Sequence, residues 1–225
     1  MPGADSRYRS LILEGKALKQ DNEFEKALKC FDKALKIKQD NPELWFDKGY
    51  TLLILERYQE AIDSFEESIK INSEKPVVWY NKGECLAELK NHNQAIACFD
   101  KALALGIYDE HVFFRKGHSL ALSGKMDEAI ACFNKAIEIN KKEPVLWTAV
   151  ADALMSVPDK EKEAILAYFE ALELAPTRDL LWKALGDAYR RLGKNNLAIH
   201  CYEEAFRIDS KNTKYLDGKC QSLIA

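Results

Sequence analysis

Small and hydrophobic residues recur along this chain with a period of about 34 residues. One column places an alanine four residues before an aromatic ring, as in Ala61 and Phe65. The six rings of that column are Phe31, Phe65, Phe99, Phe133, Tyr168 and Tyr202. A column of small residues runs in register with them: Gly15, Gly49, Gly83, Gly117, Ala151 and Gly186. Several columns that keep register over six units indicate a tandem repeat, which must be recognised before any other feature is interpreted.

The spacing inside one unit predicts two helices. Trp45, Gly49 and Leu52 share one face of a first helix, and Ala61 and Phe65 share one face of a second. Glycine inside a helix costs about 1 kcal/mol relative to alanine. Its return in the first helix therefore predicts a close approach between helices. A helix pair cannot bury its apolar face alone, so we expect the units to stack.

The sequence resembles the tetratricopeptide repeat family. The last full unit carries Trp182, Leu185, Gly186 and Tyr189 in the first half of that family's pattern, and Ala198 and Tyr202 in the second half. The resemblance implies an all-α fold, a right-handed superhelical solenoid of antiparallel helix pairs. We expect a tail at residues 1–7, six units and a C-terminal capping helix at residues 213–225. The units are 8–41, 42–75, 76–109, 110–143, 144–178 and 179–212.

The fifth unit is irregular. Residues 157–161 replace the usual short turn, and Ala164 arrives one residue late. Pro158 should stop the first helix of this unit, because proline has no N–H and clashes with the preceding turn. Two interpretations stay open, a tolerated insertion and a recognition loop.

The resemblance also implies that the first helices line a concave groove that holds a peptide or a partner helix. The groove residues should be those off the packing columns of the first helices. They are Phe46, Tyr50, Tyr80, Asn81, Glu84, Phe114, Arg115, His118 and Asp152. The four aromatic residues would be apolar anchors, with Glu84, Arg115 and Asp152 fixing the register of the ligand. The alternative is that these rings pack between repeats as ordinary core.

One sub-class of the family grips the terminal carboxylate of chaperone tails. Asn81 and Arg115 stand at two of its positions, but Phe46, Tyr50 and His111 replace the other polar residues. The clamp is incomplete, so an apolar or amphipathic segment suits this surface better.

Composition and charge narrow the function further. The chain has 33 basic and 36 acidic side chains among 225 residues, without the basic footprint of a nucleic-acid binder. The sequence shows no secretory signal or membrane span, so we expect a cytoplasmic protein with reduced cysteines. Residues 42–75 carry a net negative charge, which could favour a mildly basic ligand there.

Catalysis is not expected. His111 and His118 lie two helical turns apart, too far to hold one metal ion. We therefore predict no catalytic residues, no metal and no cofactor, and a non-catalytic scaffold or adaptor for a protein or peptide partner. The alternatives are self-association into a weak homo-oligomer through the terminal helices, and service as the binding part of a larger assembly.

Overall fold

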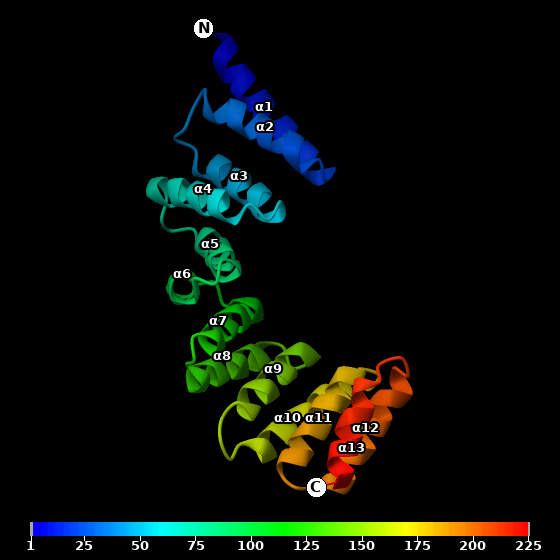
Figure 1. The fold of residues 1–225 in the computed structure, drawn as a ribbon. Helices are drawn as coiled ribbons and strands as arrows, with labels where there is room; N and C mark the ends of the chain where they lie inside the picture. The colour runs from blue at the N-terminus through cyan, green and yellow to red at the C-terminus, as the bar shows by residue number, and fades with distance from the viewer. Residues whose placement is uncertain (1, 225) are drawn as a thin grey trace. The chain divides into compact units, whose positions relative to one another are not determined.

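The computed structural model describes the backbone of residues 2–224 and the side chains of residues 3–223 (Figure 1). The described residues form thirteen α-helices and contain no strand. The helices divide into two compact bodies, Met1–Tyr108 and Asp109–Ala225, each of which is described by itself. The predicted all-α fold of stacked helix pairs is confirmed.

The first body contains three helix pairs. Its helices are α1 (Pro2–Gln20), α2 (Phe24–Leu35), α3 (Pro42–Ile54), α4 (Tyr58–Ile71), α5 (Pro76–Glu88) and α6 (His92–Ala104). Each first helix packs against the second helix of its own pair, and α2 and α4 also contact the first helix of the next pair. The first helices α1, α3 and α5 touch in succession, so their outer faces form one continuous surface.

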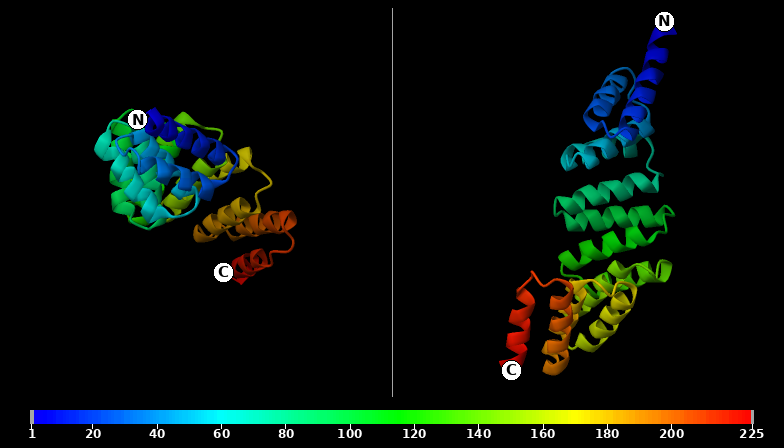
Figure 2. Two further views of the ribbon diagram at one scale, coloured as in Figure 1. Left: turned by 90° about the horizontal axis from the view of Figure 1, so that it is seen from above. Right: turned by 90° about the vertical axis from the view of Figure 1, so that its right-hand side faces the viewer.

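The second body contains three further pairs and a closing helix. Its helices are α7 (Glu110–Leu122), α8 (Met126–Ile139), α9 (Pro144–Met155), α10 (Glu161–Leu174), α11 (Asp179–Arg191), α12 (Asn195–Ile208) and α13 (Lys214–Ile224). Figure 2 shows the helices of each body following one another in chain order. Helix α13 packs on α12 and touches α11, which is the position that the first helix of another pair would take.

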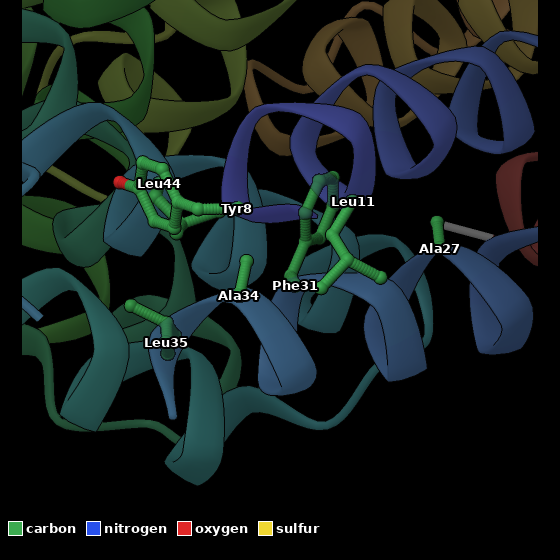
Figure 3. Packing of buried hydrophobic residues seen from close by; sticks show 7 residues of the cluster. All are labelled: Tyr8, Leu11, Ala27, Phe31, Ala34, Leu35 and Leu44. Atoms are coloured by element: carbon green, nitrogen blue, oxygen red, sulfur yellow. The ribbon is translucent and has the colours of Figure 1, made fainter. Parts of the chain in front are cut away.

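The core at the start of the chain joins three helices. Tyr8 and Leu11 from α1 pack with Phe31 from α2 and Leu44 from α3 (Figure 3). Tyr8 also accepts a hydrogen bond from the Asn41 side chain at 3.0 Å, which ties α1 to the turn before α3. These contacts hold the middle of α1 against α2 and α3.

Residues 2–7 belong to α1 and do not form the separate tail that we expected from the sequence. Asp5 and Arg9 are four residues apart and form an ion pair at 3.9 Å. An acidic residue in the first turn stabilises a helix N-terminus, because it interacts favourably with the unsatisfied N–H groups there. The helix thus starts before the first repeated column.

The repeated glycines allow close approach, as predicted. A Cβ atom at Gly49 would lie 2.7 Å from Cε1 of Phe65, and one at Gly83 would lie 2.7 Å from the same atom of Phe99. Gly117 and Gly186 stand in the same relation to Phe133 and Tyr202. The ring of the second helix therefore occupies the space that a side chain on the first helix would need.

The tryptophans of the repeat anchor the turns between units. In four units the indole N–H donates to a backbone carbonyl six residues earlier, at 2.8–3.0 Å. The pairs are Trp45 with Gln39, Trp79 with Ser73, Trp147 with Lys141, and Trp182 with Pro176. A buried column lies one residue before the four tryptophans and before the equivalent Phe113 and Leu216: Leu44, Val78, Val112, Leu146, Leu181 and Tyr215. The tryptophans are themselves only half-buried, and at the edge of the core they join each first helix to the turn that precedes it.

The turn inside each pair follows one pattern in five of the six units. In the second unit Glu56 has a positive φ of 58°, and the N–H of Arg57 donates to the carbonyl of Leu52 at 2.9 Å. This is the Schellman arrangement that ends a helix through one left-handed residue. The left-handed residues are Asn22, Glu56, Lys90, Gly124, Asp159 and Gly193.

The fifth unit departs from that pattern because of its extra residue. Helix α9 ends at Met155, three residues before Pro158, and Asp159 takes the left-handed conformation one residue late. Among the described residues, Lys160 makes no backbone hydrogen bond equivalent to that of Arg57. The insertion is thus absorbed in the turn.

A candidate peptide-binding surface

The first-helix surface of the first body carries half-exposed aromatic rings. Phe46 and Tyr50 on α3 stack on each other with ring centroids 6.1 Å apart. Phe46 also packs at 6.0 Å against Phe65. We call Phe65 and the equivalent aromatic rings of the other second helices the seam rings. Tyr80 on α5 packs in the same way against Phe99 at 5.9 Å. Phe46 and Tyr80 are thus tied to the core while they remain partly exposed, and Tyr50 is held between Phe46 and Lys19.

Asn81 does not face this surface. Its side chain is 5% exposed, and its amide donates to the backbone carbonyl of Val77 at 2.7 Å. A helix turns by about 100° per residue, so the position after Tyr80 points between helices. Glu84, three residues further along α5, is half-buried.

The same column holds a buried charge in the unit before. Asp47 is buried, and it accepts from Lys19 at 2.5 Å and pairs with Lys16 at 3.4 Å. The other acidic residues of this unit lie mainly on the second helix α4, among them Glu60, Asp63, Glu66 and Glu67. The net negative charge of residues 42–75 is thus concentrated away from the first-helix surface, and it gives no support to a basic ligand there.

In the second body, three of the residues expected from the sequence meet at one pocket. Phe114 and His118 from α7 and Asp152 from α9 line a cavity of about 550 Å³. The two rings of α7 lie 6.4 Å apart, and Phe114 also packs on the seam ring Phe133 at 5.8 Å. Arg115, one residue further along α7, is half-buried and does not line this cavity.

The remaining walls of this pocket are largely apolar and come from several elements. They include Leu122, Met126, Val145, Ala149 and Ala153, while Thr148, Ser156 and Arg178 supply polar groups. Leu122 is 57% exposed, so its alkyl surface is open to a ligand. We call this cavity the apolar pocket. Its size lies within the range of small-molecule and side-chain sites, which are concave, mainly apolar and edged by a few polar groups.

Asp152 connects the apolar pocket to the core. Its carboxylate accepts a hydrogen bond from the hydroxyl of Tyr168 at 2.5 Å. Desolvation by the surrounding helices raises the pKa of Asp152 above its ordinary value, against the opposite effect of the Tyr168 bond. The same environment raises the pKa of Tyr168. The pair therefore fixes a carboxylate at the edge of the pocket.

A second cavity, also of about 550 Å³, lies on the other side of Asp152. Lys183, Asp187, Arg190 and Arg191 of α11 line it together with Asp152. We call it the charged pocket. Tyr168 also lines this pocket, and Tyr202, the equivalent ring of the next unit, donates to Asp187 at 2.8 Å.

The sequence alone did not point to all of these residues. Leu122 and Met126 lie near the turn of the fourth unit, and Arg178 is the residue before α11. Their contribution depends on how the turns are placed between helices. The 34-residue column pattern carries no information about that placement.

The structure also bears on metal binding, membrane crossing and the reactivity of the cysteines. In residues 2–224, no group of three or more His, Cys, Asp or Glu side chains is placed to hold a metal ion. None of the described helices combines the length and the apolar character that a membrane crossing requires. The six cysteines are free thiols, and five of them are buried. Burial raises the pKa of the Cys85 and Cys201 thiols to about 12, which makes them poor nucleophiles.

Comparison with known families gives three matches along the chain. Residues 20–102 match the family described as anaphase-promoting complex, cyclosome, subunit 3. Residues 74–142 and 180–212 match two families that are each described as tetratricopeptide repeat. No curated protein matches the sequence at a significant level.

Several solved structures share the fold. The C-terminal part of a TPR repeat-containing protein from Cytophaga hutchinsonii is 18% identical, with a TM-score of 0.80 over 94% of this chain and 84% of that one. PilF of Pseudomonas aeruginosa is 18% identical, with a TM-score of 0.74 over 97% and 99% of the two chains. YrrB, described as a TPR protein with an unusual peptide-binding site, is 17% identical, with a TM-score of 0.74 over 84% and 97%.

Proposed function

The chain belongs to the tetratricopeptide repeat family, and we propose that it is a non-catalytic scaffold that binds a peptide or helix of a partner protein. The observation that carries this proposal is the apolar pocket, where Phe114, His118 and Asp152 stand together. Alkyl and ring carbon make up most of its wall, which suits the burial of an apolar side chain.

The half-exposed rings of the first body support the same function. Phe46 and Tyr80 each pack on a ring of the second helix and stay only partly buried, and Tyr50 stacks on Phe46. Aromatic residues held rigidly in this way are typical of binding hot spots, because little side-chain entropy is lost when a ligand covers them. YrrB has a peptide-binding site on the same fold, and this analogy adds support without identifying a ligand.

The buried thiols bear on the cellular compartment of the protein, and its net charge bears on the kind of partner. Five cysteines lie in the core as free thiols, which favours a reducing compartment such as the cytoplasm. A net charge of -3 favours a protein partner over a nucleic acid. We place the scaffold in the cytoplasm on these grounds.

The test compares two phenylalanines of the second body. Peptides are selected from a random display library on the full chain, and their affinities are then measured by fluorescence anisotropy. Phe114→Ala should weaken binding by about tenfold or more, as expected for the loss of a hot-spot ring. Phe169→Ala is the matched control, because Phe169 is 42% exposed on the second helix α10. Equal effects of the two variants would exclude the pocket, and thermal unfolding of each variant checks that its fold is intact.

Self-association is a second candidate, supported by one face of α13. Leu216 and Leu223 are 40% and 64% exposed, and they lie seven residues apart. That spacing puts them on one side of the helix, about 100° around the axis from the buried Tyr215 and Ser222. Sedimentation equilibrium over a range of protein concentrations should show a dimer that Leu216→Glu removes. A monomer at every concentration would rule this candidate out.

A further inference from the structure

We propose that the charged pocket binds the carboxylate of an acidic side chain from the same partner segment that fills the apolar pocket. This inference rests on the proposed function and adds the chemistry of the partner: an acidic residue placed close to an apolar one. The observations that carry it are the charge balance of the pocket, the bonds already made inside it and its position beside the apolar pocket.

The charged pocket holds more cations than anions. Lys183, Arg190 and Arg191 face the two carboxylates of Asp152 and Asp187. A net positive charge therefore remains in a concave site. Such a site attracts an anionic group.

The acidic residues of the pocket already have partners. Asp187 accepts from Lys183 at 2.6 Å and from Tyr202 at 2.8 Å, and Arg190 lies 3.7 Å from the same carboxylate. Asp152 accepts from Tyr168 at 2.5 Å. Asp187 thus has three partners inside the protein and Asp152 has one, so part of their acceptor capacity is already used.

The cations keep donors to spare. Lys183 has three N–H groups and Arg191 has five. Among the described residues, Lys183 donates to Asp187 alone, and Arg191 donates to the Met155 carbonyl alone. Arg190 is held by Tyr202, which accepts from its Nε at 3.3 Å. A carboxylate can accept two parallel bonds from an arginine, and such bonds are stronger than those between neutral groups.

The position of the pocket links it to the apolar pocket. Asp152 lines both cavities, so the two lie side by side along the first helices α7, α9 and α11. Packed helices are about 8–10 Å apart, and an extended chain advances about 3.3 Å per residue. An apolar and an acidic side chain about three residues apart would therefore reach both pockets.

The experiment pairs a change in the peptide with a change in the protein. Peptides selected from a random display library on the full chain are synthesised with amidated C-termini, which removes the terminal carboxylate. Each peptide is compared with its Glu→Gln or Asp→Asn version on wild type and on Lys183→Gln/Arg191→Gln. Lys142→Gln/Lys162→Gln is the matched control, because both of its lysines are exposed outside the pocket in the same body.

We expect the selected peptides to carry an apolar residue two to four positions from an acidic one. Neutralising that acid should weaken binding to wild type and to the control variant by about tenfold. It should have almost no effect on the variant that lacks Lys183 and Arg191, because the two changes remove one shared interaction.

Two results would overturn the inference. If neutralising the acid has equal effects on all three proteins, the acid does not bind at Lys183 and Arg191. If the selected peptides lack acidic residues but still depend on Phe114, the apolar pocket binds a ligand and the charged pocket does not. A library that yields no peptide dependent on Phe114 contradicts the proposed function itself, and the inference with it.

Discussion

The two bodies repeat one helix pair, but their seam rings differ in polarity. The first body uses Phe31, Phe65 and Phe99, whereas the second uses Phe133, Tyr168 and Tyr202. In both bodies the ring packs against a small residue of the first helix. The residue after that small one differs: it is Lys16, Tyr50 and Glu84 in the first body, and His118, Asp152 and Asp187 in the second.

Ring and neighbour change together in the last two units. Tyr168 donates to Asp152, and Tyr202 donates to Asp187. A buried hydroxyl needs an acceptor, and a carboxylate at this position provides one. The first body presents aromatic rings on α3 and α5. The second body keeps one such ring, Phe114 on α7, and adds carboxylates on α9 and α11 that accept from tyrosines. One repeat thereby supports two kinds of surface without a change of backbone.

The largest expected effect concerns alkaline pH. Burial raises the pKa of Tyr202 from 10.0 to about 12, and Tyr202 is 1% exposed. The neutral ring is thus favoured in the folded state, so its contribution is complete below pH 10 and is lost as the pH rises through 12. Tyr202 alone should lower the free energy of unfolding by roughly 2–3 kcal/mol over this range, in addition to the loss from other buried groups with a raised pKa, such as Tyr168.

Equilibrium urea unfolding from pH 8 to pH 12 checks this prediction. Tyr202→Phe should be less stable at neutral pH, because Asp187 loses a donor, and should show a smaller loss at high pH. Tyr108→Phe, which changes an exposed tyrosine of the first body, serves as the control. Identical pH dependences of the free energy of unfolding for wild type and Tyr202→Phe would show that the ionisation of Tyr202 does not affect stability.

A smaller effect on stability is expected when the tyrosine–carboxylate pair of the second body is introduced into the first body. Phe65→Tyr adds a buried hydroxyl opposite Tyr50, which has no carboxylate, and should cost about 1–3 kcal/mol. Tyr50→Asp in the same chain places the acceptor where Asp152 and Asp187 stand. The double variant should recover about 1 kcal/mol relative to the sum of the single changes.

Hydrogen exchange followed by mass spectrometry is suited to this measurement, because it reports the stability of each body separately. Tyr50→Asp alone supplies the second single variant of the cycle. Purely additive effects would mean that the tyrosine and carboxylate of the second body are neighbours without an energetic link.

Much of the fold could be predicted from the sequence, because a period repeated six times averages out local ambiguity. The contact of Gly49 with Phe65 and the turn at Asn22 follow patterns that recur in five of the six units. The surface was harder to predict. Asn81 is one residue from Tyr80, yet the helical rotation buries it, and Arg178 reaches the apolar pocket from a turn. Both depend on three-dimensional detail that a column pattern does not contain.

The smallest expected effect concerns the turns inside the helix pairs, where the bodies differ again. The left-handed residues of these turns are Asn22, Glu56 and Lys90 in the first body, whereas the second has Gly124, Gly193 and, in its irregular fifth unit, Asp159. A left-handed conformation costs a non-glycine residue about 1–2 kcal/mol, and asparagine less. Glu56→Gly should therefore stabilise the first body by about 1 kcal/mol, and Asn22→Gly by less.

Gly124→Ala provides the reverse test in the second body. A Cβ at Gly124 would meet no atom within 4 Å, so only the backbone conformation opposes the change. We expect this variant to lose about 1 kcal/mol, which hydrogen exchange should report in the helices around residue 124 alone. A stabilising effect of Gly124→Ala, or a destabilising effect of Glu56→Gly, would contradict the role of the left-handed residue in ending these helices.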